Sequence, residues 1–152
     1  MQNDRAKILD TACGPGNISK FLLSKMSSYQ VLGFDLAPNM VDLTSKNNPT
    51  TDFTVMDSRD IEQIKDKFDV VVCGFCTPYL SKTDVEALLV KIKGLLNPDG
   101  ILYLSTMAGT DSMSGYQTSS AGDQVYIHYH EYDHLKKHLQ SNRLNRPEFI
   151  GD

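Results

Sequence analysis

The sequence predicts an α/β fold, with an open, mainly parallel, doubly wound sheet that carries helices on both faces. Strand-like runs alternate with helical patterns from the start of the chain, as expected of βαβ units with right-handed crossovers. The continuous apolar run Val70-Val71-Val72 indicates a central parallel strand covered on both faces. The segment from Ile8 to Asn17 passes from an apolar run through an acid and a two-glycine loop into a helical pattern, which brings backbone N–H groups close to a nucleotide-like ligand.

The elements follow in order along the chain. Five strands are expected, over residues 7–11, 30–35, 52–56, 68–73 and 100–106. Helical spacing places one apolar face on Ile18, Phe21, Leu22 and Met26, and another on Val85, Leu88, Leu89, Ile92, Leu95 and Leu96. Thr83 with Glu86 predicts a capping box at the start of the second of these helices, and the Asn-Pro-Asp-Gly sequence at 97–100 predicts the turn into the last strand.

Residues 107–124 interrupt this alternation. Half of them are Gly, Ser or Thr and they show no periodicity, which predicts a long loop. Because this loop follows the last strand of the sheet, we expect it to form a mobile wall beside the ligand crevice, with Met113 and Tyr116 as apolar contacts. A short extended piece at 125–129 and a helix at 131–140, with Leu135 and Leu139 on one face, are expected after it.

Length and composition limit the class of protein. The 152 residues are expected to form a single domain, 1–152, of ordinary composition. The net charge of −4 argues against a broad nucleic-acid-binding face, and no apolar run approaches the ~20 residues that span a membrane. The first seven residues hold no apolar signal-peptide core, and three cysteines give no disulfide framework, so a cytoplasmic protein is expected.

Acids stand at the ends of three successive predicted strands. Asp10 lies near the end of the first, Asp35 ends the second and Asp57 follows the third. With the two glycines, this pattern is far more specific than a lone G-x-G, which turns require for steric reasons alone.

The motifs ILDTACGPGN, VLGFDLAPNMVDL, FTVMDSRDI, FDVVVCGF and LLNPDGILYLST, in this order and at this spacing, resemble those of the class I S-adenosylmethionine-dependent methyltransferases. The resemblance covers about residues 7–106. It implies the strand order 3-2-1-4-5, with a ligand crevice where strands 1 and 4 part. It also implies that elements are missing at both ends, because the family usually carries helices before the first motif and two antiparallel strands at the end.

The resemblance implies roles for residues around the methionine part of the donor. The backbones of Gly14 and Gly16 would approach it, and Asp10 would hold its ammonium group directly or through water. The backbone of Cys73 and Gly74 would close the same end.

Four further residues would hold the adenosine part. Asp35 would accept hydrogen bonds from both ribose hydroxyls, Leu36 and Met56 would sandwich the adenine, and Asp57 would accept from its amino group. The alternatives are structural: Asp57 as a helix cap ahead of 60–64, and Asp35 as a cap before Pro38.

A dinucleotide-binding oxidoreductase is the main rival. Its fingerprint requires a third glycine where this chain has Ser19. Asp10 would also place a carboxylate beneath a pyrophosphate, at a cost of about 1 kcal/mol or more, whereas an acid-lined crevice suits a cationic sulfonium ligand. S-adenosylmethionine is therefore the expected cosubstrate.

Other residues offer alternative chemistry. Cys73 and Cys76 form a C-x-x-C pair, a spacing that is redox-active or metal-binding in other settings. A zinc site there would take Cys13 and either His128 or His130 as its further ligands. Buried cysteine is commonly just a small apolar residue, and no metal is expected. Cys76-Thr77-Pro78-Tyr79 departs from the (Asp/Asn)-Pro-Pro-Tyr loop of amino-methylating enzymes at its first two positions, which does not support DNA-base methylation.

No catalytic residue is assigned by the sequence. Tyr79 is a candidate for the wall of the acceptor pocket, or for simple packing. His128 and His130 would face one way in a strand and are candidates for a general base, or for surface or structural histidines.

The sequence thus predicts methyl transfer to a small-molecule acceptor, with no nucleic-acid or membrane partner. The alternatives are a donor-binding module without catalysis on its own, and a thiol or metal protein that uses Cys73 and Cys76.

Overall fold

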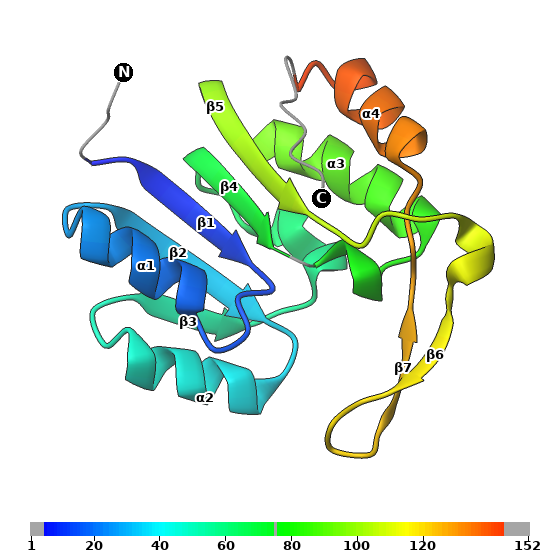
Figure 1. Cartoon of the computed structure of the whole chain (residues 1–152). Coiled ribbons are helices and arrows are strands. Elements are labelled where there is room, and N and C mark those ends of the chain that lie inside the picture. Colours follow the sequence, from blue (N-terminus) through cyan, green and yellow to red (C-terminus); the bar gives the residue numbers. More distant parts are fainter. Residues whose placement is uncertain (1–4, 75, 145–152) are drawn as a thin grey trace.

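The computed structural model describes residues 5–74 and 76–144, and its centre is a five-stranded parallel sheet in the order β3-β2-β1-β4-β5 (Figure 1). The strands are β1 (Lys7–Thr11), β2 (Gln30–Asp35), β3 (Asp52–Val55), β4 (Phe68–Gly74) and β5 (Leu96–Ser105). β1 pairs with β2 on one side and with β4 on the other. The predicted fold class and strand order are confirmed, and four of the five strands agree with their expected bounds to within one residue.

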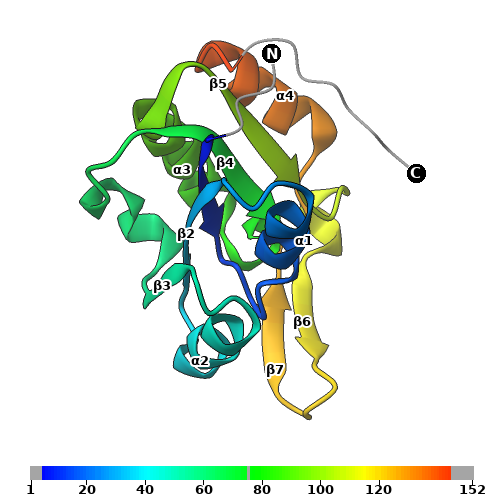
Figure 2. The same cartoon turned by 90° about the vertical axis from the view of Figure 1, so that its left-hand side faces the viewer.

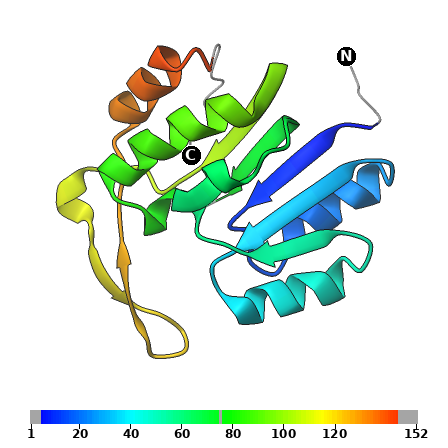
Figure 3. The same cartoon turned by 180° about the vertical axis from the view of Figure 1, so that it is seen from behind.

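Helices cover both faces of the sheet. α1 (Asn17–Lys25) and α2 (Pro38–Asn47) lie on one face, and α3 (Lys82–Leu95) and α4 (Tyr132–Ser141) lie over β4 and β5 on the other (Figures 2 and 3). Short 3-10 helices η1 (Ser58–Gln63), η2 (Thr77–Tyr79) and η3 (Asp111–Met113) lie in the connections. None of the helices within residues 5–74 and 76–144 has the length and apolar content of a membrane-spanning segment.

The main core lies between the sheet and α3. The predicted apolar face of this helix is buried, and Val85, Leu89 and Ile92 are fully enclosed against the sheet. The predicted capping box is wrong. Ser81 caps the helix and its hydroxyl accepts from the backbone N–H of Asp84, because Ser81 has the extended backbone that an N-cap requires, while Glu86 points toward α4.

The sequence predicted a long loop over residues 107–124, and this prediction is wrong, because part of the segment has regular structure. It contains η3 and the strand β6 (Gly115–Thr118), which pairs antiparallel with β7 (Gln124–Ile127). The hairpin extends beyond the carboxyl ends of the sheet strands (Figure 1). Its two strands also hold an edge-to-face contact between Tyr116 and Tyr126, with ring centroids 5.1 Å apart. Side-chain pairing across the hairpin thus replaces the missing apolar alternation.

The face of the sheet that carries α1 is only partly covered. Ile18 and Phe21, on the predicted apolar face of α1, are both exposed, as is Tyr103 on β5. Together with Val70 and Val72 they line an apolar groove of about 500 Å³. Among the described residues, no element covers the face of β4 and β5 that lines this groove (Figure 1). Val70 is therefore only half-buried, and the prediction that the valine run is covered on both faces is wrong for this residue.

Candidate functional site

The glycine loop (residues 12–16) connects β1 to α1 at the carboxyl edge of the sheet. A Cβ atom on Gly14 would meet nothing within 4 Å, which leaves space on that side for a ligand to approach the backbone. A Cβ on Gly16 would collide with Thr44 of α2, and Gly16 has a φ of 81° as the N-cap of α1. Gly16 therefore sets the packing of two helices, while Gly14 faces the open side.

Asp10 lies buried beneath the glycine loop. Its side chain is on β1, the residue is only 1% exposed, and Oδ2 accepts a 2.6 Å hydrogen bond from the Ser19 hydroxyl on α1. Burial raises the pKa of this carboxyl to about 6, although the Ser19 hydrogen bonds act in the opposite direction and Asp35 adds to the rise. A buried carboxylate that is ionised at neutral pH suits a cationic ligand group.

Asp35 ends β2 and holds the glycine loop in place. One carboxylate oxygen accepts from the backbone N–H of Gly14 and the other from that of Ala37, both at 2.9 Å. The second bond closes a local turn, but Asp35 is not the helix cap that was its structural alternative, because the N-cap of α2 is Ala37 and no side chain caps that helix. The first ties the end of β2 to the glycine loop, and the role of Asp35 toward a ribose stays a prediction.

The adenosine side of the site is formed after β2 and β3. Leu36 is 62% exposed, which is unusual for a leucine, and Met56 is half-buried against the core. Asp57 caps η1 through Arg59 N–H and forms a two-pronged pair with the Arg59 guanidinium, whose hydrogen bond lowers the pKa of Asp57. The structure confirms the helix cap that was the structural alternative for Asp57, and the expected role of Asp57 toward adenine stays a prediction.

The three thiols are free and are not arranged as a zinc site. Cys73 and Cys76 are buried, and Cys76 Sγ lies 3.2 Å from the Ser58 hydroxyl. The hydrogen bond with Cys76, together with burial, raises the pKa of Cys73 well above its usual range, and burial raises that of Cys13 to about 12. Within the described residues, no cysteine belongs to a group of three ligand atoms close enough to share a metal ion.

The candidate acceptor side lies around η2. Tyr79 is 63% exposed, and the end of the β7 segment docks beside it through a 2.8 Å hydrogen bond from His128 N–H to the Pro78 carbonyl. His128 and His130 stack with ring centroids 6.3 Å apart, so they face one way as expected. His130, however, is buried and its Nε2 lies 2.8 Å from the Thr77 carbonyl, which is the geometry of a packing histidine.

Aromatic side chains extend this surface onto the hairpin. Tyr126 contacts the rings of both Tyr116 and His128, so the row runs from the hairpin to the segment beside η2. Tyr116 is 72% exposed, and Met113 is also exposed. The expectation that these residues contact an acceptor stays a prediction.

Sequence reasoning missed two features of this site. Ser19 is fully buried as the partner of Asp10, and its position in the first turn of α1 was the only signal for it. Ala12 has a φ of 48°, a left-handed conformation that disfavours any side chain with a Cβ, and nothing in its residue type indicated this.

Comparisons with known proteins agree with this architecture. A family model described as a methyltransferase domain matches residues 8–100. The malonyl-[acyl-carrier protein] O-methyltransferase of Acetivibrio thermocellus is 28% identical over 104 residues, which cover 67% of this chain and 36% of that protein. An uncharacterized protein of Rickettsia prowazekii, RP028, is 28% identical over 98% of this chain and 60% of its own length.

Solved structures share the fold. CalS10 of Micromonospora echinaspora, an amino pentose methyltransferase solved with S-adenosylmethionine bound, has a TM-score of 0.73 at 18% identity, over 91% of this chain and 75% of its own. The chain spans between about a third and three fifths of the length of the curated relatives it matches. By the match of the family model and by its sheet order, the chain belongs to the class I S-adenosylmethionine-dependent methyltransferases.

Proposed function

We propose that the chain binds S-adenosylmethionine at the carboxyl ends of β1, β2 and β3 and transfers its methyl group to a small-molecule acceptor. The observation that carries this proposal is the buried carboxylate of Asp10 beneath an open glycine loop, with Asp35 tied to the same loop. The two carboxylates attract a cationic ligand and repel a pyrophosphate, so they favour binding of the first and disfavour binding of the second. The exposed Leu36 supplies an apolar surface for a flat adenine ring.

The residues present fit this cosubstrate at both ends. Asp10 would hold the ammonium group from beneath the glycine loop, and Asp35 would accept from the ribose hydroxyls once the ligand displaces or shares its bond to Gly14. Bound S-adenosylmethionine supplies an electrophilic methyl group on a cationic sulfur. An acceptor lone pair forms the new bond to that carbon while the carbon–sulfur bond breaks and its electrons stay on sulfur, so the reaction needs no covalent enzyme intermediate.

The protein's contribution to such a reaction is alignment and exclusion of water. Tyr79, Tyr116 and Tyr126 offer rigid apolar surface for this on the acceptor side. His128 is half-buried next to them and is the better placed of the two histidines for accepting an acceptor proton, because His130 is bonded to Thr77.

Relatives support a small or carrier-borne acceptor. Their names specify malonyl-[acyl-carrier protein], ubiquinone biosynthesis and an amino pentose, none of which is a nucleic acid. We also propose a reducing cytoplasm as the location, because the sequence holds three cysteines, an odd number that gives no disulfide framework.

Calorimetry with the donor tests the first half of the proposal. S-adenosylmethionine and S-adenosylhomocysteine should compete for one site, and NAD should not bind. Because burial raises the pKa of Asp10 to about 6, donor affinity should rise as the pH is increased from 5 to 7. Tighter binding of NAD than of S-adenosylmethionine would refute the assignment.

A screen for methyl transfer tests the second half. Labelled S-adenosylmethionine is incubated with pools of small alcohols, phenols, amines and thiols, and label in the organic phase is counted. Turnover with any acceptor identifies an enzyme, whereas donor binding without turnover in every pool favours the alternative of a donor-binding module. Stoichiometric zinc or a defined disulfide potential at Cys73 and Cys76, with no donor binding, would favour the thiol protein.

A further inference from the structure

Three side chains meet at the contact between α3 and α4, on a part of the fold that the proposed methyl transfer does not use. Glu86 comes from α3, and His134 and His138 come from α4. Glu86 Oε1 lies 2.8 Å from His134 Nε2 and 3.4 Å from His138 Nε2. We call these residues the histidine–glutamate cluster.

The convergence is specific at the level of atoms. His134 and His138 are four residues apart on one helix, so their rings lie on the same face, with centroids 4.5 Å apart. Both rings present Nε2 to the same carboxylate oxygen, and the three ligand atoms lie within 4.8 Å of one another. An i, i+4 histidine pair with a carboxylate from a second element is a donor set that binds zinc.

The distances suit one small divalent ion. Ligand atoms bound at about 2.0–2.1 Å in a tetrahedral arrangement lie about 3.3–3.4 Å apart. The two separations from Glu86 Oε1, 2.8 Å to His134 Nε2 and 3.4 Å to His138 Nε2, bracket this value, so small side-chain rotations would admit the ion. The cluster is partly exposed, with side-chain exposures of 38%, 15% and 27% for Glu86, His134 and His138. An ion can therefore enter, and water can fill the fourth position.

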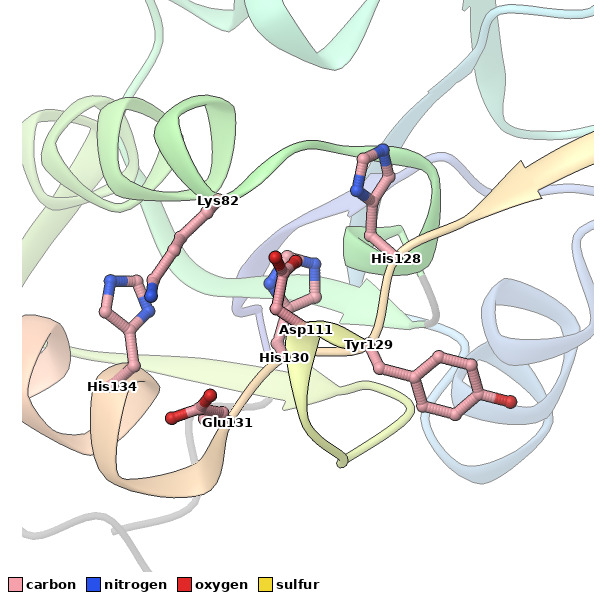
Figure 4. Close-up of a pocket in the computed structure, with 7 residues that line it drawn as sticks. All are labelled: Lys82, Asp111, His128, Tyr129, His130, Glu131 and His134. Carbon is pink, nitrogen blue, oxygen red and sulfur yellow. The ribbon is translucent and has the colours of Figure 1, made fainter. Parts of the chain in front are cut away.

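The electrostatics favour a cation, at moderate affinity. Glu86 supplies a carboxylate oxygen beside the two imidazole nitrogens, which is a mixed oxygen and nitrogen ligand set of the kind that zinc takes. Lys82, one turn earlier on α3, adds an opposing positive charge. Lys82 and His134 also line the same small cavity of about 10 Å³, together with Glu131 and Asp111 (Figure 4).

The outer shell of the cluster is incomplete. His134 Nδ1 is buried and has no hydrogen-bond partner among the described residues, whereas a metal-bound histidine usually donates from its second nitrogen. Three ligands with one unsupported ring predict binding weaker than that of a closed, four-ligand structural zinc site.

We propose that the histidine–glutamate cluster binds a divalent transition metal ion of the zinc class and thereby links α4 to α3. α4 follows directly after the His128–His130 segment, which docks on η2 beside the candidate acceptor surface. A metal ion at this position fixes the helix that anchors that segment. The inference is independent of donor binding.

The test is a titration of the full chain, carrying no affinity histidines and stripped with chelator, with Co²⁺ alone and then with Zn²⁺. Co²⁺ at one equivalent should give the visible ligand-field spectrum of a four- or five-coordinate site, and Zn²⁺ should remove it. Zn²⁺ should also raise the melting temperature, since it binds the folded state. His138→Ala and Glu86→Gln should each weaken binding at least about tenfold.

Matched controls separate this cluster from the other ligands in the chain. His128→Ala and Glu62→Gln remove a histidine and a carboxylate outside the cluster and should leave Co²⁺ affinity unchanged. Cys73→Ala with Cys76→Ser should also leave it unchanged. If His138→Ala is poorly folded by circular dichroism, His138→Gln keeps the side-chain volume and should show the same loss of binding.

The proposal is overturned by three outcomes. The first is the absence of stoichiometric Co²⁺ or Zn²⁺ binding. The second is binding that persists in a folded His138→Ala or His138→Gln variant. The third is binding that disappears in the cysteine variant, which would move the metal to the C-x-x-C pair.

Discussion

Replacing Asp10, the buried acid of the candidate site, should stabilise the protein and weaken its binding of S-adenosylmethionine. Burial raises the pKa of Asp10 from 3.8 to about 6, which is a shift of about two units. At about 1.36 kcal/mol per unit, the ionised carboxylate makes the folded state less stable by about 3 kcal/mol at most. Asp10→Asn removes this charge and keeps an oxygen that accepts from Ser19.

The sign of the pH dependence follows from the direction of the shift. The folded state holds the Asp10 proton more tightly than the unfolded state, so the parent loses stability as the pH rises from about 4 to about 6. The variant has no such group. Its free energy of unfolding, relative to the parent, should therefore increase by up to about 3 kcal/mol between pH 4 and pH 7 and stay constant above that.

Urea denaturation at pH 4.5, 5.5, 6.5 and 7.5, followed by circular dichroism, measures this difference. Asp69→Asn is the control, because the Lys7 N–H and the Asn97 amide lower the pKa of Asp69 and its titration falls below this window. Its difference from the parent should be flat. If the difference in free energy of unfolding between Asp10→Asn and the parent does not change with pH, ionising the buried carboxyl does not destabilise the fold. If the variant binds S-adenosylmethionine as tightly as the parent, Asp10 is not part of the ligand site.

Three further predictions concern the two sides of the crevice. Asp35→Ala should weaken donor binding by roughly 1.5–3 kcal/mol, because hydrogen bonds to a charged acceptor are lost. If calorimetry shows unchanged donor affinity and the melting temperature falls sharply, Asp35 has only a structural role. Ala12→Gly should raise the free energy of unfolding by about 0.5–1 kcal/mol in urea titrations, because glycine tolerates the φ of 48°. A lower free energy of unfolding would contradict the inference that the Ala12 backbone is strained. Tyr116→Ala should impair turnover and spare donor affinity, and equal turnover with any acceptor found in the screen would place Tyr116 outside the acceptor surface.

The sheet could be predicted from the sequence because its signals are local. The bounds of β1 and β2 follow from short apolar runs that end at a glycine loop or an acid, and the buried face of α3 follows from helical spacing. The acids of the candidate site lie where those runs end, so the position of Asp35 beside the glycine loop could also be predicted from the sequence.

The features that were missed depend on contacts between distant residues. β6 lacks apolar alternation and forms because it pairs with β7, which sequence spacing alone does not reveal. The helix cap depended on whether Ser81 or Thr83 has the extended backbone, and both residue types cap helices. His134 and His138 were visible as an i, i+4 pair, but Glu86 lies 48 residues before His134 and joins it only through the packing of α3 against α4.

The central position of β1 also affects the order in which the sheet assembles. β1 is the first strand of the described chain, yet one of its two neighbours, β4, is about 62 residues further along, as the bond from Lys7 N–H to Asp69 shows. At a synthesis rate of about 5–20 residues per second, β4 emerges roughly 3–12 s after β1. We therefore expect the β3-β2-β1 half to form first on the ribosome, with one edge of β1 unpaired until β4 and α3 follow, so that interval is when the nascent chain is most exposed to aggregation.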